Sequence, residues 1–107
     1  MQSIDFSRTE RLSDLFKHEI ADVLRNKVRD PRLSNLTILQ VRVTPDLRNA
    51  VVSFSATNSF NDIEIEEVKR ALSKAKGFIR KSLSKTMKLK RIPEISFELT
   101  DSYLFQL

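Results

Sequence analysis

The 107-residue sequence contains no cysteine and only one glycine, and each absence removes a class of structure or chemistry. Without cysteine the chain has neither disulfide bonds nor thiolate metal ligands, which fits a reducing compartment. A single glycine leaves no material for a glycine-rich phosphate-binding loop. No apolar run approaches the ~20 residues needed to span a bilayer, and residues 1–11 lack the apolar stretch of a signal peptide. We therefore expect a cytoplasmic protein.

Residues suited to catalysis and metal binding are equally scarce. His18 is the only histidine, and its place between Lys17 and Glu19 in a helical pattern predicts a surface or core-edge residue. Zinc sites and nucleophilic triads require cysteine or further histidines. The acidic residues are scattered in the manner of ordinary surface charge. We therefore expect no catalytic residue, no metal, no cofactor and no enzymatic activity.

Positive charge is what the sequence has in excess. The formal net charge is +5, which favours nucleic acid as the partner and, less strongly, an anionic membrane surface. Ten of the 19 lysine and arginine residues lie from Val68 to Arg91, in a segment without any acidic residue. Its apolar residues recur at the three- and four-residue steps of one helical face: Val68, Leu72, Ala75, Ile79 and Leu83. Four lysines with similar spacing fall roughly opposite on a helical wheel: Lys74, Lys81, Lys85 and Lys88.

The segment therefore predicts a helical region that buries one face and presents a basic face to a polyanion. We predict that its basic residues bind RNA: Lys74, Lys76, Arg80, Lys81, Lys85, Lys88, Lys90 and Arg91. A second cluster follows the first predicted helix and comprises Arg25, Lys27, Arg29 and Arg32. Two interpretations of this cluster remain open, contact with the carbonyls that end a helix and binding of phosphate. Phenylalanines mostly occupy core-phase positions, so an aromatic sheet that stacks splayed bases is not expected.

The chain reads as a single domain over residues 1–107, with 1–6 as a flexible leader and 101–107 as a possible C-terminal tail. A helix is predicted over 8–28, begun by a Ser7-x-x-Glu10 capping box and ended by Asp30-Pro31. The further elements follow in order: strands at 36–44 and 50–56, helices at 63–76 and 78–87, and a strand at 95–99. In the first strand, alternation places Leu39, Val41 and Val43 on one face.

These elements predict an α+β fold with the order α-β-β-α-α-β. The first two strands form an antiparallel hairpin, and a right-handed crossover makes the last strand parallel to the second. The result is a two-layer domain with helices on one face of a three-stranded mixed sheet. Gly77 interrupts the basic helical pattern. It is either tolerated inside one helix at ~1 kcal/mol relative to alanine or marks a kink or cap between two helices, and we favour the second interpretation.

Four short motifs in order resemble the ribosome-binding factor A family. They are Asp30-Pro31-Arg32-Leu33, the run from Val41 to Ala50, the run from Ala75 to Arg80, and the run from Leu89 to Phe97 with Asp101 beyond. The resemblance extends from about Thr9 to Asp101. It implies a type II KH-like domain in which an Ala-x-Gly kink, here Ala75 and Gly77, replaces the GXXG loop that clamps nucleotides in ordinary KH domains.

The resemblance also implies a function. Members of the family are bacterial assembly factors that bind the small (30S) ribosomal subunit and its 16S rRNA during late maturation. They support 16S rRNA processing and growth in the cold. The residues alone leave two alternatives, a generic KH-like module for RNA or DNA and an adaptor whose basic face meets an acidic protein or an anionic membrane. We expect the protein to be monomeric and not to bind membranes.

Overall fold

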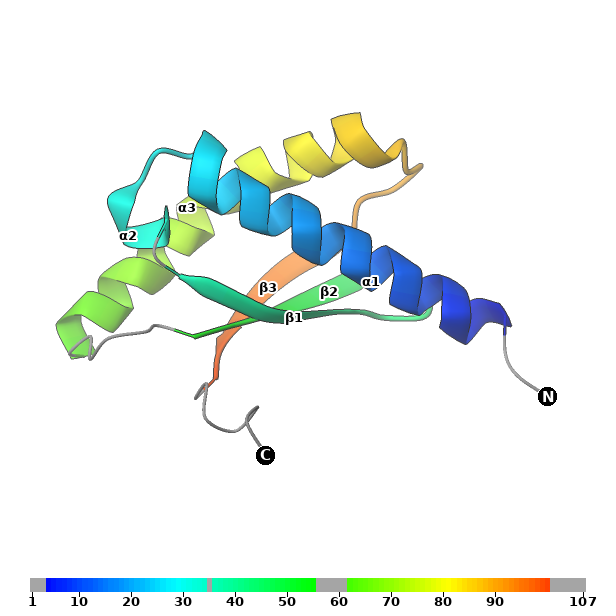
Figure 1. Cartoon of the computed structure of the whole chain (residues 1–107), viewed down its shortest axis with the longest axis horizontal. Coiled ribbons are helices and arrows are strands. Elements are labelled where there is room, and N and C mark those ends of the chain that lie inside the picture. Colours follow the sequence, from blue (N-terminus) through cyan, green and yellow to red (C-terminus); the bar gives the residue numbers. More distant parts are fainter. Residues whose placement is uncertain (1–3, 35, 56–61, 101–107) are drawn as a thin grey trace.

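The computed structural model describes residues 4–34, 36–55 and 62–100, which form two layers with the long helices on one face of a sheet (Figure 1). The elements are α1 (Ile4–Asp22), the π-helical turn η1 (Val23–Lys27), α2 (Pro31–Ser34), β1 (Thr37–Val43), β2 (Asn49–Ser55), α3 (Asp62–Met87) and β3 (Glu94–Leu99). The strand order is β1-β2-β3, with β1 antiparallel and β3 parallel to β2. The predicted α+β class and mixed sheet are therefore confirmed.

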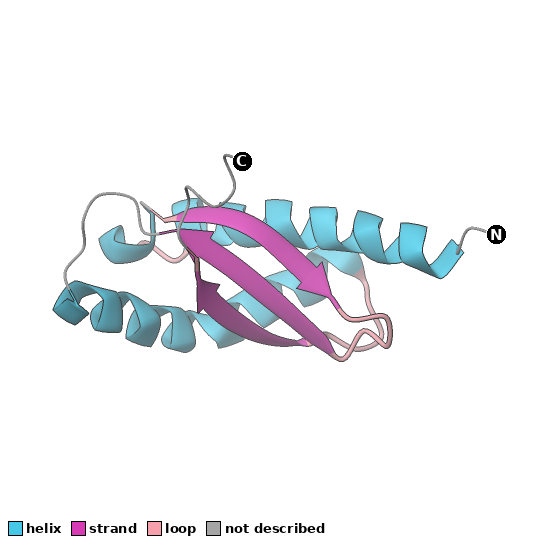
Figure 2. Ribbon diagram, turned by 90° about the horizontal axis from the view of Figure 1, so that it is seen from below, coloured by secondary structure: helices cyan, strands magenta, loops and turns pink. Residues whose placement is uncertain are grey.

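The core lies between the sheet and the two long helices, which Figure 2 shows behind the strands when the molecule is seen from below. The helical repeat predicted in the basic segment is confirmed, because its five apolar residues are all buried: Val68, Leu72, Ala75, Ile79 and Leu83. From α1, Phe16 and Ile20 meet them, and Phe54 and Ile95 close the core from the sheet. Leu15 of α1, although apolar, is 58% exposed and does not belong to the core.

Helix α1 begins earlier than predicted. It starts at Ile4, so residues 4–6 are helical rather than a leader, and the proposed capping box of Ser7 and Glu10 is wrong because both residues lie inside the helix. No glycine or proline occurs before Pro31, so nothing in the sequence stops the helix from extending towards the N-terminus. The predicted C-terminal tail at 101–107 lies outside the described residues.

The alternation predicted for the first strand fails at Leu39. The register shifts between Ile38, which pairs with Phe54, and Gln40, which pairs with Ser53. Such a bulge adds one residue to a strand and changes which side chains face the core. Ile38 is consequently buried, as are Val41 and Val43, whereas Leu39 is only partly buried.

The two predicted helices at 63–76 and 78–87 are one helix. Helix α3 continues without interruption through Gly77, so the prediction that a new helix begins at Phe78 is wrong. No glycine has a positive φ, which excludes the left-handed cap that often ends helices at glycine. The ribbon of α3 bends near its middle in Figures 1 and 2 without breaking. The buried side chains of Ala75 and Ile79 hold the segment against the core on both sides of Gly77 and offset its low propensity.

Replacing Gly77 with alanine is expected to raise the free energy of unfolding by about 1 kcal/mol. An added Cβ would meet no atom within 4 Å, and the backbone is already helical, so only the propensity changes. Chemical denaturation would measure the gain, with Ser73→Ala on the exposed side of the same helix as a smaller propensity control. A Gly77→Ala variant that is less stable than the parent would instead show that the bend in α3 requires glycine.

Candidate nucleic-acid interface

The junction between α1 and α2 is the first part of the candidate interface. Helix α1 gives way to the π-helical turn η1, and Arg29 then takes a positive φ of 60°. Asp30 caps α2 by accepting the backbone N–H of Arg32 at 3.0 Å, and Pro31 occupies the first helical position, where its missing N–H costs nothing. The Asp30-Pro31 stop was predicted correctly, but the short helix that Pro31 begins was missed.

Asp30 and Arg32 fix each other across this junction. The guanidinium of Arg32 donates from Nε and Nη2 to the two carboxylate oxygens of Asp30, at 3.1 and 2.9 Å. The hydrogen bond from the Arg32 side chain holds the pKa of the Asp30 carboxyl below its ordinary value, and the charge of Lys74 on α3 acts in the same direction. Asp30 therefore stays ionised and neutralises Arg32, so Arg32 is a structural residue of the junction.

Arg29 stands where a helix ordinarily ends with glycine. A residue with a side chain costs about 1 kcal/mol in the left-handed region, where glycine is unstrained. We therefore expect Arg29→Gly to raise the free energy of unfolding by about 1 kcal/mol in denaturant titrations. Arg25→Gly, inside the helical turn η1, is the matched control and should lower it by a similar amount. Equal losses in the two variants would contradict the strain assigned to Arg29.

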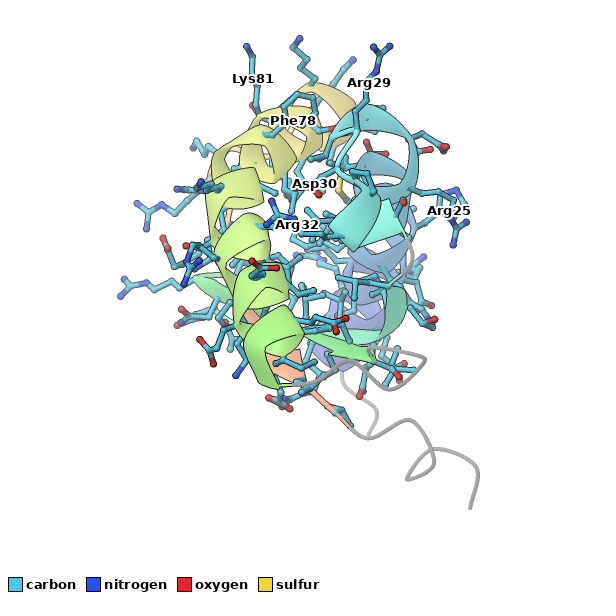
Figure 3. The ribbon with its side chains drawn as sticks, turned by 90° about the vertical axis from the view of Figure 1, so that its left-hand side faces the viewer. Arg25, Arg29, Asp30, Arg32, Phe78 and Lys81 are labelled. Carbon is cyan, nitrogen blue, oxygen red and sulfur yellow. The ribbon has the colours of Figure 1, made fainter. Side chains whose placement is uncertain are left out.

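Two contacts place this junction against α3. The hydroxyl of Ser82 donates to Oε2 of Glu19 at 2.8 Å, which ties α3 to α1. At the other end, Lys74 lies close enough to Asp30 to affect its pKa. The part of α3 between these contacts therefore runs alongside the residues that end α1 and begin α2. Figure 3 looks directly at this side of the molecule.

Four exposed residues of α3 face this side at helical spacing: Lys74, Phe78, Lys81 and Lys85. At about 100° per residue they lie within roughly 60° of one another. The three lysines are exposed and lie roughly 120° to 160° around the helix from the centre of the buried stripe, so they are roughly opposite it, as predicted, whereas Phe78 lies nearer to it, at about 100°. In Figure 3, Lys81 and Arg29 project to the same side, and Phe78 lies between them.

The eight predicted RNA-binding residues do not share one face. Lys76 and Arg80 fall on the opposite flank of α3, where Nη2 of Arg80 donates to the Ile92 carbonyl at 3.3 Å and Nη1 lies 4.0 Å from Oε1 of Glu94. Lys88, Lys90 and Arg91 are exposed in the connection between α3 and β3. Of the predicted set, only Lys74 and Lys81 lie in the part of α3 that runs beside the α1–α2 junction, and Lys85 continues the same side of α3 one turn further along.

The second basic cluster, which follows the first predicted helix, also divides into residues that form ion pairs and residues that do not. Lys27 pairs with Glu19 and Asp22, and Arg32 pairs with Asp30. Arg25 and Arg29, by contrast, are exposed and form no ion pair or hydrogen bond between side chains within residues 4–34, 36–55 and 62–100. Lys74, Lys81 and Lys85 on α3 are likewise exposed and form no ion pair within these ranges. Arg25 projects away from α3, on the side of the junction that faces β1 (Figure 3). We call the remaining surface the basic flank, and it consists of Arg29, Lys74, Phe78, Lys81 and Lys85.

Sequence reasoning missed Phe78 as part of the surface and left Arg25 and Arg29 undecided. A signal for Phe78 was present, because it lies four residues after Lys74 and three before Lys81, out of phase with Ala75 and Ile79. Phe78 is 48% exposed. The direction of the Arg29 side chain, in contrast, depends on how the chain turns after α1, and the sequence pattern does not predict that turn. His18 is exposed, as predicted.

The rest of the described chain offers no comparable site. A groove of about 910 Å³ runs between α1 and the edge strand β1, but its lining mixes acidic and basic side chains, including Glu10, Asp14 and Arg42. In the described ranges no three histidine or acidic side chains gather as a metal site. Nor does any helix within them combine the length and apolarity needed to cross a membrane.

Comparison with known proteins agrees with the fold and covers nearly the whole chain. The family model "Ribosome-binding factor A" matches residues 8–104. Ribosome-binding factor A of Syntrophus aciditrophicus is 42% identical over 100 residues, which are 94% of this chain and 80% of that protein. The crystal structure of ribosome-binding factor A from Thermus thermophilus superposes with a TM-score of 0.73 at 26% identity and covers 85% of this chain and 94% of its own.

A second structure of the Thermus thermophilus factor is a homology model fitted into a cryo-EM map of its complex with the 30S subunit. It superposes with a TM-score of 0.68 at 27% identity and covers 84% of this chain and 92% of its own. Both Thermus thermophilus structures therefore share the fold of this chain over most of their length.

Proposed function

The chain belongs to the ribosome-binding factor A family, and on that premise we propose that it binds the small ribosomal subunit through rRNA and assists the subunit's late maturation. The observation that carries the proposal is the basic flank, whose four cations form no ion pairs within the described residues. A relative of the same fold is fitted into a map of a 30S complex, which supports the small subunit as the partner.

The basic flank suits recognition of folded RNA by charge and shape. Lysine and arginine bind phosphate oxygens, and each phosphate they neutralise releases condensed counterions, which supplies much of the affinity. Phosphate contacts fix the position of a protein on RNA but carry no sequence information. We infer that selectivity comes from the spacing of the cations on two elements, the α1–α2 junction and α3. Lys88, Lys90 and Arg91 extend the charge beyond α3 and remain part of the proposed RNA-binding set.

Binding alone is sufficient for the proposed role. A protein that occupies an immature conformation of the subunit shifts the population of that conformation without covalent chemistry. The role includes support of 16S rRNA processing and of growth in the cold. Deletion of the gene should therefore lead to accumulation of unprocessed 16S rRNA, most strongly at low temperature. Normal processing in the deletion strain would contradict this part of the proposal.

Sedimentation in sucrose gradients with purified small subunits, mature and immature, across a series of salt concentrations would test the proposal. We expect preferential binding to immature subunits, with log Kobs falling linearly against log salt. Equal binding to unrelated structured RNA would favour a generic KH-like RNA-binding module. An association with protein that survives nuclease treatment, without any binding to subunits, would favour an adaptor for an acidic partner.

A further inference from the structure

Phe78 is exposed where neither the core nor the helix requires an aromatic ring. Phe16 and Phe54 are fully buried and Phe97 packs against the core, whereas 48% of Phe78 is accessible. Its neighbour Ile79 already fills the core position on this turn of α3. Phenylalanine also has a lower helix propensity than the lysines on either side of it along the flank. A lysine or glutamine at this position would therefore serve folding about as well as the phenylalanine ring.

The surroundings of Phe78 are cationic. Lys74 and Lys81 stand one turn away on α3, and Figure 3 shows Arg29 extending alongside from the α1–α2 junction. The two nearby carboxylates are already occupied: Asp30 holds Arg32 with both oxygens, and Glu19 accepts from Ser82 and pairs with Lys27. An exposed apolar ring among unpaired cations has the composition of a site for single-stranded nucleic acid, in which bases stack on aromatic rings while the phosphates contact lysine and arginine.

The backbone of Arg29 supports a functional role for this corner. Its φ of 60° is one that glycine adopts without strain, and the chain nevertheless carries a long basic side chain there. Strained positions that persist in a fold are often found at binding sites. Here the side chain projects to the same side as Lys81, across the ring of Phe78 (Figure 3).

We propose that Phe78 stacks on one unpaired base of the bound RNA while Arg29 and Lys81 contact the phosphates on either side of that base. The inference rests on the proposed function and specifies it further. Part of the affinity comes from a base that is not paired in the bound state, so a fully duplex RNA lacks one of the contacts. The protein then distinguishes an rRNA segment that is still single-stranded from the same segment once it is paired.

Substitution of Phe78 in the full chain tests the stacking directly. Phe78→Leu keeps an apolar side chain without a ring, and Phe78→Tyr keeps the ring. We expect Phe78→Leu to bind immature subunits and a single-stranded oligoribonucleotide of mixed sequence about tenfold more weakly, and Phe78→Tyr to bind like the parent. Stacking releases no counterions, so the slope of log Kobs against log salt should be unchanged in Phe78→Leu, whereas Lys81→Ala should reduce it by about 1.

Leu99→Ala, which alters an exposed apolar residue of the sheet strand β3, serves as the control and should bind normally. Parental affinity in Phe78→Leu, or equal losses in the leucine and tyrosine variants, would overturn the stacking while leaving subunit binding intact. So would an equal loss for a duplex of the same sequence, because a duplex offers no unpaired base. Failure of the parent protein itself to bind subunits would instead overturn the proposed function.

Discussion

Reversing the charge of Lys81 and Lys85 together is expected to weaken binding to small subunits by about 100-fold at moderate salt, because each reversal removes a phosphate contact and adds repulsion. Both side chains are exposed on the basic flank and form no ion pair within the described ranges. Added salt screens the repulsion, so the difference between the double variant and the parent should shrink as the salt concentration rises.

The fold should survive this change. Glutamate has nearly the helix propensity of lysine, and neither side chain contributes to the core. A glutamate at position 85 lies in the last turn of α3, where the helix dipole disfavours it by about 0.5 kcal/mol. Circular dichroism and denaturation should therefore show a nearly native protein.

The matched control reverses two charges elsewhere. Arg8 and Arg11 are exposed on α1, and Arg8→Glu with Arg11→Glu changes the net charge by the same amount. If binding depends on the basic flank, this control loses only the small affinity that follows from net charge. Equal losses in the two double variants would show that total charge matters and that the flank has no special part. An unchanged affinity in the Lys81 and Lys85 variant would refute the flank assignment.

Truncating Ile79 to alanine is expected to lower the free energy of unfolding by about 3 to 4 kcal/mol. The side chain is fully buried between α3 and the sheet, so its loss leaves a cavity in the only extended core of the described chain. Domains of this size are stable by about 5 to 15 kcal/mol, so the change removes a large part of the total. Thermal unfolding should show a decrease in Tm on the order of 15 to 25 °C.

The adjacent residue supplies the control. Phe78→Ala removes a larger side chain one position earlier in the same helix, but from the surface, and should change the stability by less than about 0.5 kcal/mol. The two variants should show the reverse order in RNA binding at a temperature where both are folded. A similar loss of stability in both would mean that the Phe78 ring packs against the protein more than its exposure indicates.

The sequence was most informative where one helix or strand could be judged by itself. The repeat from Val68 to Leu83 identified the buried side of α3, and the alternation in the hairpin identified two strands. It was least informative where the result depends on a neighbour. A helical wheel gives the angle of Lys81 and Arg80 around α3, but only packing shows that one flank lies beside the α1–α2 junction and the other beside β3.

Local breaks in regular structure were the other source of error. The bulge at Leu39 adds a residue to β1, although no glycine or proline within the strand indicates it. At Gly77 the opposite occurred, because a residue typical of breaks lies in a helix that core packing keeps intact. The assignment of the bend to Ala75 and Gly77 therefore stays a prediction.

The parallel pairing of β2 with β3 has a consequence for the order in which the protein folds. Strand β2 ends at Ser55 and its parallel partner begins at Glu94, with the whole of α3 between them. The hairpin of β1 and β2 closes over a short loop. The pairing of β3 with β2 closes a much longer loop, so more chain entropy is lost before the contacts of β3 offset the loss. We expect β3 to join last. During synthesis the C-terminal strand is also the last to be made, so the hairpin edge that awaits it is exposed to other chains until β3 arrives.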